Sequence, residues 1–278
     1  MSGIFNKALP LKPTGRQNNT KWYLFPMSEL IYGRRPVYEA LMSERRLISK
    51  VFVLSSNTQD NIIGEILLLA QKKGIKVGGV QKNDLDRISG GGNHQGVIAE
   101  ASSYPYVELE QMVENTPEGS RPPVIVVLDH VQDPQNLGTI LRVAETAGSA
   151  GVVIPKDRSA EITPAVVRAS AGASEQIKVA RVVNITRTIA FLKEKGFWVA
   201  GLDCSKDAVS YENVDLTDPM VIVVGTEGTG LSRLVKENCD HLLHIPMYGR
   251  MDSMNVTTAL AVIIHEARRQ WRVSRKDG

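Results

Sequence analysis

Three short motifs in the second half of the chain combine an arginine, a carboxylate, amides and repeated glycines. They read Asn136-Leu-Gly-Thr-Ile-Leu-Arg142, then Gly225-Thr-Glu-Gly-Thr-Gly-Leu-Ser232, then Ile245-Pro-Met-Tyr-Gly249 followed by Ser253-Met-Asn255. Each motif follows an apolar run that is typical of a buried strand. One such motif alone is weak evidence, because glycine, asparagine, serine and proline are ordinary loop residues after strands. The three together, in this order, are much stronger evidence.

The first motif places a cation near the start of a predicted helix. Apolar residues recur there at helical spacing, at Leu137, Ile140, Leu141 and Ala144. Gly138 and Arg142 are four residues apart and share a helix face, so the missing side chain at Gly138 is expected to leave Arg142 accessible. On periodicity alone, a surface arginine of an amphipathic helix is the more common interpretation.

The second motif predicts a loop that approaches a ligand closely. Its repeated glycines follow the apolar run 220–224 and permit positive φ angles, and an adenosine fits such a loop. A dinucleotide site is not indicated, because the G-x-G-x-x-G spacing and the acidic residue about 20 positions onward are missing. Glu227 has two interpretations: a carboxylate that orders the loop by accepting backbone N–H groups, or a catalytic group that braces Asn136 or Arg142.

The third motif predicts a rigid turn and then a helix start. Pro246 ends a buried strand, and Ser253 or Asn255 precedes the apolar run 256–264. A plain helix N-cap is the simplest role for either residue.

Residue for residue, these motifs resemble motifs one, two and three of the SpoU/TrmH branch of the SPOUT methyltransferases. That family transfers a methyl group from S-adenosylmethionine to a ribose 2′-hydroxyl of RNA. The resemblance implies that the catalytic residues are Asn136, Arg142, Glu227, Ser253 and Asn255. It implies that S-adenosylmethionine is contacted by Gly225, Thr226, Gly230, Ile245, Met247 and Met254. Met254 stands where the family usually has leucine, which is a volume-conserving change.

Arg142 has two possible roles in this chemistry. A ribose hydroxyl is a poor nucleophile, so the enzyme must align it with the methyl group and remove its proton. A free arginine is a weak base because its pKa is above ~12. We hypothesise that Arg142 binds the phosphate next to the target ribose, and that phosphate and guanidinium together position or accept the proton. In the family this arginine is proposed to act as a phosphate-assisted base, and the sequence leaves both roles open.

The elements that position the motifs form an α/β domain. Near-continuous apolar runs, separated by helical stretches, lie at 124–128, 151–154, 197–201, 220–224 and 242–245. Such runs are typical of strands buried on both faces, which predicts a mainly parallel sheet covered by helices. The resemblance adds a deep trefoil knot at the end of this domain, which would form the cofactor pocket. The predicted fold class is therefore a SPOUT α/β knot.

A smaller α/β unit precedes the domain that carries the three motifs. A helix is predicted from Gly33-Arg-Arg-Pro36, a strand at 50–54, a helix at 62–73, a strand at 75–80 and a last strand at 97–101 after His94-Gln-Gly96. This unit resembles the ribosomal-protein-L30e-like RNA-binding domain that precedes the catalytic domain in many family members. The RNA contacts that it implies are Arg34, Arg35 and His94, although His94 could equally be a hydrogen-bonded loop histidine. The small-residue segment 168–173 is predicted to be a helix packing site or, less readily, part of the RNA path with Arg168.

The length of the chain and the distribution of its charges predict how it is divided into domains. A chain of 278 residues with 42% hydrophobic residues can bury two cores. We predict a basic arm at 1–26, an RNA-binding domain at 27–104, an acidic linker at 105–121 and a methyltransferase domain at 122–278. The net charge is +3, but residues 1–50 hold nine basic and three acidic residues and carry +6, so the remainder carries −3. The basic character is concentrated where an RNA-gripping element could use it.

Composition excludes several other classes. The two cysteines have no metal-ligand spacing and suggest no disulfide framework, so we expect no metal and a reducing cytoplasm. The longest apolar runs fall far short of the ~20 residues that span a bilayer, so no membrane partner is expected. The basic arm is predicted to be a flexible tail, with organelle targeting as the alternative.

The family resemblance also suggests the substrate and the assembly. The L30e-like domain and Val131-Gln-Asp-Pro134 look most like the branch that methylates a guanosine of large-subunit ribosomal RNA. Transfer RNA is the next candidate, and an antibiotic-resistance ribosomal RNA methyltransferase would share every catalytic residue. A binding module without catalysis would have lost Arg142 or Asn255, and both are present. Family members are homodimers that share active-site residues, so a homodimer is expected.

Overall fold

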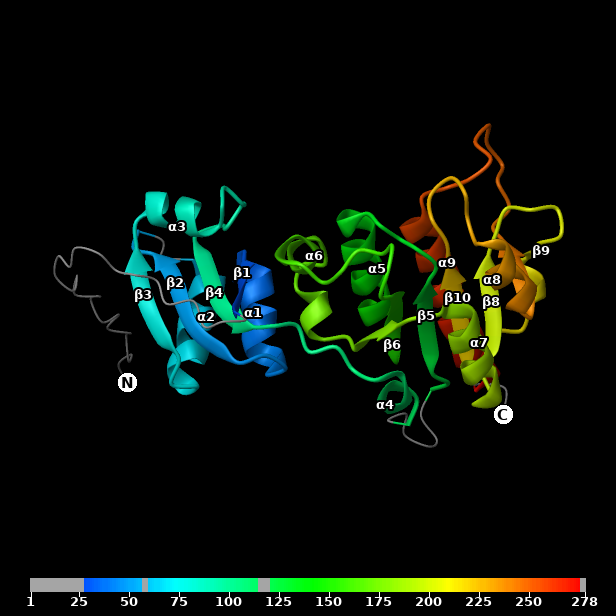
Figure 1. The fold of residues 1–278 in the computed structure, drawn as a ribbon, viewed down its shortest axis with the longest axis horizontal. Helices are drawn as coiled ribbons and strands as arrows, with labels where there is room; N and C mark the ends of the chain where they lie inside the picture. The colour runs from blue at the N-terminus through cyan, green and yellow to red at the C-terminus, as the bar shows by residue number, and fades with distance from the viewer. Residues whose placement is uncertain (1–27, 57–59, 115–120, 276–278) are drawn as a thin grey trace, which may run out of the picture. The chain divides into compact units, whose positions relative to one another are not determined.

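The computed structural model describes residues 28–56, 60–114 and 121–275, so the predicted basic arm lies outside the described residues. The chain divides into two compact units, with the boundary between Ser103 and Tyr104 (Figure 1). Each unit is built around its own β-sheet.

The first unit contains a mixed four-stranded sheet. Its elements are β1 (Ser28–Tyr32), α1 (Arg34–Ser43), β2 (Ile48–Leu54), α2 (Asn61–Lys72), β3 (Lys76–Val80), α3 (Lys82–Ile88) and β4 (Val97–Ser102). The strand order is β1-β4-β2-β3, in which only β2 and β3 are parallel. Leu85 of α3 packs on Phe52 and Ile98 on one face of this sheet. Val51 and Val53 alternate with Phe52 and are buried on the opposite face, so β2 is covered on both sides.

The second unit contains the motifs. Its first elements are α4 (Leu109–Glu114), β5 (Val124–Leu128), α5 (Pro134–Thr146), β6 (Gly151–Pro155), α6 (Pro164–Ala169), the 3-10 helix η1 (Ala173–Glu175), β7 (Val179–Val182) and α7 (Ile185–Glu194). The remaining elements are β8 (Trp198–Leu202), β9 (Val209–Ser210), the 3-10 helix η2 (Tyr211–Asn213), β10 (Met220–Val224), α8 (Arg233–Asn238), β11 (His241–His244) and α9 (Val256–Ser274).

Seven strands of this unit form one parallel sheet. Their order is β7-β6-β5-β10-β8-β11-β9, and every neighbouring pair is parallel. All residues of β5, β6 and β10 are buried. The predicted α/β class with a mainly parallel sheet is therefore confirmed. The edge strands β7 and β9 were not predicted.

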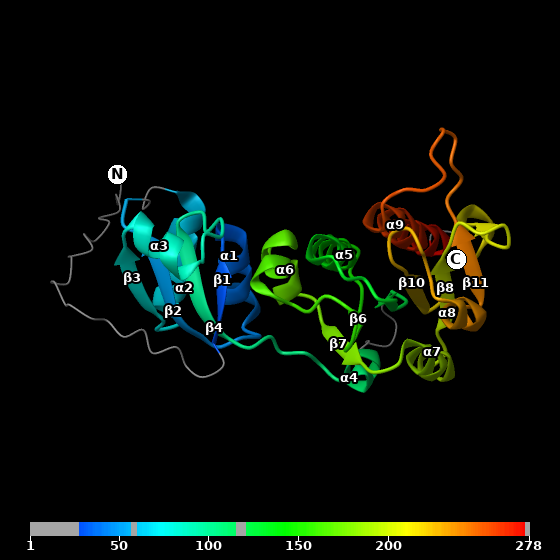
Figure 2. The same ribbon diagram turned by 45° about the horizontal axis from the view of Figure 1, so that its top comes forward.

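Helices cover both faces of the sheet. Figure 2 shows α5 and α9 on one side and α4 and α7 on the other. Ile189 of α7, Val235 of α8 and Met112 of α4 belong to one buried cluster with Val127 and Val223 of the central strands. Each central strand is thus packed between two helical layers, as its continuous apolar run predicts.

Residues 104–114 pack on the second unit, although most of this stretch falls in the predicted linker 105–121. The Val107 N–H donates to the Val179 carbonyl (2.9 Å), and Met112 is buried in the core. The Tyr104 hydroxyl donates to the Ser174 carbonyl (2.7 Å). Within the three described ranges, no helix is both long and apolar enough to cross a lipid bilayer.

Candidate active site

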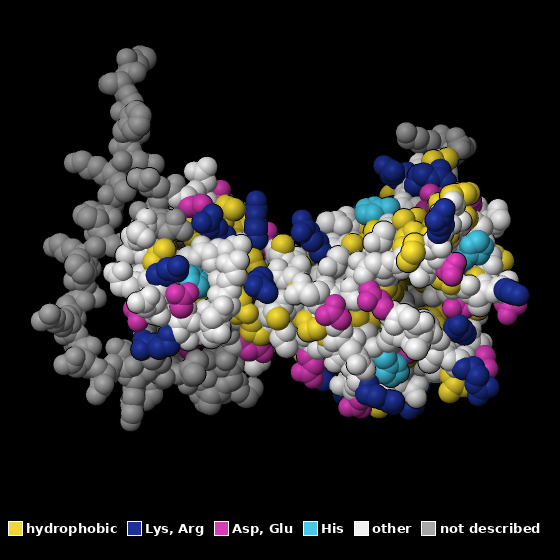
Figure 3. All heavy atoms as spheres, turned by 90° about the horizontal axis from the view of Figure 1, so that it is seen from above, with side chains coloured by type: hydrophobic (Ala, Val, Ile, Leu, Met, Phe, Trp, Pro, Cys, Tyr) yellow, Lys and Arg dark blue, Asp and Glu magenta, His cyan; other side chains and the backbone are white. Residues whose placement is uncertain are grey.

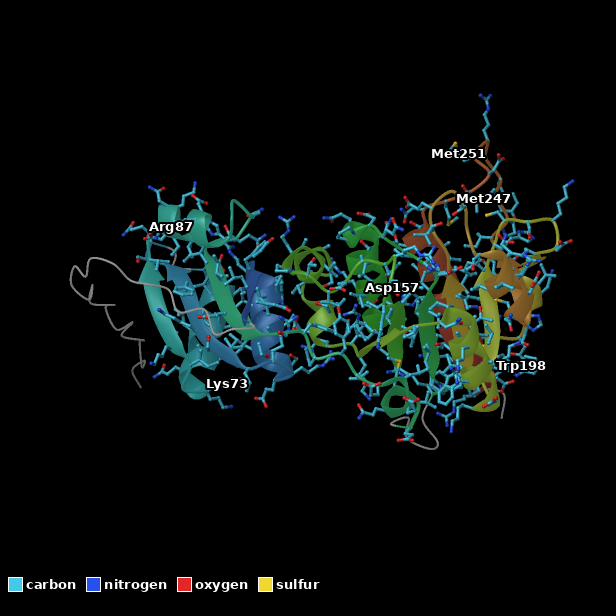
Figure 4. All side chains as sticks on the ribbon, in the orientation of Figure 1. Lys73, Arg87, Asp157, Trp198, Met247 and Met251 are labelled. Carbon is cyan, nitrogen blue, oxygen red and sulfur yellow. The ribbon has the colours of Figure 1, made fainter. Side chains whose placement is uncertain are left out.

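All three motifs lie at one edge of the parallel sheet. The first follows β5, the second follows β10 and the third follows β11, and the carboxyl ends of parallel strands meet at a common edge. Ligands of open α/β sheets bind at this edge. Figure 4 shows Met247 and Met251 in the loop that rises from it, and Figure 3 views this side and shows hydrophobic side chains beside lysines and arginines.

Asn255 joins the three motifs through its side chain. Its Nδ2 donates to Glu227 Oε1 and to Asn136 Oδ1, the latter at 3.4 Å. Its Oδ1 accepts from the Thr257 N–H (2.8 Å) and the Thr257 hydroxyl (2.5 Å), which caps the N-terminus of α9. Asn255 is therefore both a helix cap and the centre of a polar cluster that we call the Asn255 cluster, formed by Asn136, Glu227 and Asn255.

Asn136 is fixed by the start of α5. Asp133 is the N-cap of this helix, and its carboxylate accepts from the N–H groups of Gln135 (3.2 Å) and Asn136 (3.1 Å). Pro134 occupies the first turn, where its missing N–H costs nothing. The capped first turn thus holds Asn136 within hydrogen-bonding distance of Asn255.

Arg142 does not join the Asn255 cluster. It lies six residues after Asn136 on α5, which places it about 240° further around the helix. Its side chain is exposed and forms no hydrogen bond or ion pair with any described residue. Arg142 is an uncompensated cation on the surface of α5.

The prediction of open space at Gly138 was wrong, because α6 and the turn that follows it fill this space. A Cβ at this position would overlap the Ala169 side chain and lie 2.9 Å from the Ser170 nitrogen of the turn after α6. Gly138 is buried and allows α5 and α6 to approach closely. This contact confirms the packing interpretation of segment 168–173, while Arg168 itself remains exposed.

The glycine loop of the second motif is a tight turn that leaves no room at its first residue. Thr226 and Gly230 exchange both backbone hydrogen bonds (3.1 and 3.0 Å). Gly228 and Gly230 have positive φ angles of 88° and 68°. A Cβ at Gly225 would overlap the Gly230 backbone, so only glycine fits there. The turn presents Glu227 to Asn255.

A buried aspartate that the sequence reasoning missed anchors the far end of this loop. Asp129 follows β5 directly, and its Oδ2 accepts the Ser232 N–H at 2.7 Å. His130, at a positive φ of 62°, places Nδ1 2.6 Å from Asp129 Oδ1. The available signal was a carboxylate immediately after a fully buried strand.

The other residues of the third motif do not join the Asn255 cluster. Ile245, Met247 and Met254 are half-buried, as expected of apolar contacts at a pocket wall. Ser253 is exposed and forms no side-chain hydrogen bond with the described residues, so the structure does not bring it into the Asn255 cluster. Tyr248 is 95% exposed at the tip of the loop.

In the first unit, two of the predicted RNA contacts, Arg34 and His94, line a cavity, and Arg35 does not. Its volume is about 400 Å³, and its lining includes Arg34, Lys82, His94 and Gln95. Arg34 donates to Asp60 (2.5 Å) and, from Nε, to the Gln95 carbonyl (3.2 Å). The guanidinium of Arg34 is thereby held at the cavity wall.

The side chain of His94 is used within its own unit. Nε2 lies 3.0 Å from Asp86 Oδ1, and Nδ1 accepts the Gly96 N–H at 3.0 Å. The residue is only 7% exposed. This geometry matches the hydrogen-bonded loop histidine. Arg35 lies with its guanidinium 5.9 Å from the centre of the Tyr38 ring.

Across residues 28–56, 60–114 and 121–275, no three His, Cys, Asp or Glu side chains gather in a way that could hold a metal ion.

Known proteins match both units. The SpoU rRNA Methylase family matches residues 123–265, and a domain described as RNA 2′-O ribose methyltransferase substrate binding matches residues 30–107. A Bacillus subtilis protein named for the TrmH family of tRNA/rRNA methyltransferases is 38% identical over 242 residues, which cover 87% of this chain and 96% of the relative.

Solved structures have folds similar to that of this chain. The SpoU methyltransferase AviRb of Streptomyces viridochromogenes, in complex with AdoMet, superposes with a TM-score of 0.73 at 23% identity and covers 89% of this chain and 91% of its own, which supports the fold. An AdoMet-bound rRNA methyltransferase of Sinorhizobium meliloti superposes with a TM-score of 0.71 at 26% identity over 87% of each chain. The chain therefore belongs to the SpoU/TrmH family of RNA ribose 2′-O-methyltransferases.

Proposed function

We propose that this enzyme transfers a methyl group from S-adenosylmethionine to the 2′-hydroxyl of a ribose, that of a guanosine in large-subunit ribosomal RNA. The observation that carries the proposal is the Asn255 cluster, which joins all three motifs at the carboxyl edge of the sheet. The cluster supplies amide and carboxylate groups that can hold a hydroxyl, and Arg142 supplies a free cation for a phosphate.

The residues at this edge fit S-adenosylmethionine. The Gly225–Gly230 turn brings bare backbone to the edge, and Ile245, Met247 and Met254 add half-buried apolar side chains. When bound, the cofactor supplies a methyl group on a sulfonium, which is already activated for displacement.

The side chains of the protein then have to place the nucleophile. Asn136 and Glu227 hold the ribose hydroxyl in line with the methyl group, and the bond from Asn255 keeps their orientation. Arg142 binds the adjacent phosphate, and guanidinium and phosphate together position or accept the hydroxyl proton.

A homodimer would explain why Arg142 points away from the Asn255 cluster of its own subunit. Arg142 is exposed and uncompensated, so it is free to enter the active site of a partner subunit. In that case a mixture of Arg142→Ala and Asn255→Ala proteins regains part of the activity, because half of the mixed dimers' sites combine an intact arginine with an intact cluster.

The substrate assignment rests on the first unit and on the relatives. The matched substrate-binding domain carries Arg34 and Lys82 at its cavity, and these cations suit a phosphate backbone. Two solved relatives are named as SpoU or rRNA methyltransferases, whereas the Bacillus relative is named for both tRNA and rRNA. An RNA substrate of this kind would place the enzyme in the cytoplasm.

The test uses radiolabelled S-adenosylmethionine with deproteinised large-subunit rRNA, with small-subunit rRNA and with bulk tRNA. Label is mapped by the resistance of a 2′-O-methylated ribose to alkaline cleavage. A single labelled guanosine in large-subunit rRNA, lost in Arg142→Ala, supports the proposal. Label in tRNA alone would replace the substrate, and cofactor binding without transfer to any RNA would contradict the enzymatic function.

A further inference from the structure

The cavity of the first unit is formed by α3, by the loop that follows it and by the start of α1. Lys82 and Asp86 lie on α3, residues 91–96 belong to the loop, and Arg34 and Leu54 complete the lining. Figure 1 shows α3 and this loop at one end of the four-stranded sheet. The volume of about 400 Å³ is in the range of sites for small molecules, so the cavity is large enough for a single nucleotide.

Two opposite charges on α3 face the cavity without neutralising each other. Lys82 and Asp86 are four residues apart, a spacing at which opposite charges on a helix can pair. They form no ion pair, and Lys82 is exposed and has no acidic partner within 4 Å among the described residues. The cavity thus presents a cation and a carboxylate together, which suits a ligand that carries both an anion and N–H donors.

His94 fixes the orientation of the Asp86 carboxylate. The His94 side chain is 9% exposed, and its Nδ1 accepts the Gly96 N–H at 3.0 Å, so Nδ1 carries no proton. The ring proton is therefore on Nε2, which donates to Asp86 Oδ1 at 3.0 Å. Oδ2 has no hydrogen-bond partner among the described residues, and the Asp86 side chain is 47% exposed. One oxygen is held by the protein, and the other is open to a ligand.

The side chain of Gln95 adds an amide donor to the lining. Its Oε1 accepts the Arg34 N–H at 3.1 Å, which fixes the orientation of the amide. Its Nε2 has no hydrogen-bond partner in the described part of the chain. The Gln95 backbone has a positive φ of 50°, and its carbonyl accepts from Arg34 Nε at 3.2 Å. The loop and α1 therefore hold each other at the cavity wall.

We propose that this cavity binds an unpaired guanosine of the RNA substrate, with Asp86 on the edge of the base and Lys82 on a phosphate. The inference rests on the proposed function and names the nucleotide that the first unit selects. Guanine has two adjacent donors on its Watson–Crick edge, N1–H and the N2 amine, and a carboxylate can accept from both. In adenine and cytosine an acceptor nitrogen lies next to the amine, and in uracil two carbonyls flank N3–H, so a carboxylate repels these edges.

An RNA nucleotide is favoured over a free metabolite by the family of the first unit. Residues 30–107 match a substrate-binding domain of RNA 2′-O ribose methyltransferases. Proteins read RNA sequence mostly at unpaired bases, whose Watson–Crick edges are accessible. The groups proposed to hold the ribose hydroxyl belong to the second unit, so Asp86 is expected to affect the KM for RNA and not kcat.

The test compares short RNAs that differ in one base. The probe is a fluorescent heptamer of uridines whose central nucleotide is guanosine, inosine, adenosine or uridine, and its binding to the full-length protein is measured by anisotropy. We expect the guanosine heptamer to bind about tenfold more tightly than those with adenosine or uridine. The inosine heptamer lacks the N2 amine and should bind with intermediate affinity. Equal affinities for guanosine, adenosine and uridine would overturn the proposal.

The variant Asp86→Asn tests the carboxylate. Its amide oxygen can still accept from His94, while an NH₂ group replaces Oδ2 and cannot accept from guanine. We expect this variant to lose the preference for guanosine, and Lys82→Met to weaken all four heptamers alike. The matched control is Asp84→Asn, which changes a carboxylate of α3 that pairs with Arg87 and does not line the cavity. A preference that survives in Asp86→Asn, or that Asp84→Asn also removes, would contradict the assignment.

A measurement on the unaltered protein covers the case in which Asp86→Asn does not fold. A heptamer with a central 6-thioguanosine is cross-linked to the protein by ultraviolet light, and the attachment site is located by mass spectrometry. Attachment within residues 82–96 supports the proposal, and its absence there would refute it. These binding measurements contain no S-adenosylmethionine, so a failure to methylate any RNA would refute the proposed function and leave the test of the cavity intact.

Discussion

The side chain of Asn255 has two roles, as a helix cap and as a hydrogen-bond donor in the Asn255 cluster, and two substitutions can separate them. Its Oδ1 caps α9 through Thr257, and its Nδ2 holds Glu227 and Asn136. Asn255→Asp keeps an acceptor for the cap and removes the donor. It also sets a second carboxylate against Glu227. Asn255→Ala removes both the cap and the donor.

The expected magnitudes differ for stability and for activity. Loss of an N-cap costs about 1 kcal/mol, which lowers the Tm by roughly 2–4 °C in a domain of this size. Asn255→Ala should show this shift and Asn255→Asp much less, because a carboxylate also interacts well with the positive end of α9. Loss of one positioning donor costs about 10²–10³ in rate, by analogy with an oxyanion donor. Both variants should show that loss at pH 7.

The pH dependence of Asn255→Asp follows from the pair of carboxylates. Two carboxylates in contact cannot both ionise freely, so one of the two pKa values is raised. Below the raised pKa that group is protonated and can donate to its neighbour, so part of the activity should return as the pH falls. Above it, the pair repels and the Asn255 cluster separates.

The assay measures methyl transfer by both variants relative to the unaltered enzyme from pH 5.5 to 8.5, with the Tm measured at each pH. Thr257→Val is the control, because it removes only a hydroxyl on the capping side. The reasoning fails if Asn255→Asp is fully active at pH 7, or if the activity lost by Asn255→Ala only follows its lost stability. Either result would reduce Asn255 to a helix cap.

Three further predictions concern packing and thiol chemistry. Gly138→Ala should destabilise the enzyme by about 1–3 kcal/mol in urea unfolding, since the added methyl overlaps Ala169, and Ala169→Gly should restore only part of the loss, because the methyl still lies 2.9 Å from the Ser170 nitrogen. Arg268→Met should cost about 2 kcal/mol or more and lower the Tm, since three backbone carbonyls lose donors at 2.7–3.0 Å, and an unchanged Tm would contradict this assignment. Burial raises the pKa of Cys239 to about 12, so at pH 8 Ellman's reagent should react rapidly with exposed Cys204 alone, and two rapid equivalents would disprove the burial of Cys239.

The central sheet could be predicted because its strands are buried on both faces. Uninterrupted Val and Ile runs in β5, β6 and β10 leave no other arrangement for so much apolar surface. The edge strands lack this signal. In β7, half-exposed Arg181 interrupts the run, and β9 has only two residues. Their pairing is decided by the neighbouring strand and not by their own composition.

The motifs of the site could be predicted, but their contacts could not. Asn136 and Asn255 are 119 residues apart, and nothing in either motif specifies that one amide bonds the other. Gly138 shows the same limit, because its spacing from Arg142 says nothing about α6, which fills the space. Residue types and order follow from the sequence, whereas partners follow from tertiary packing.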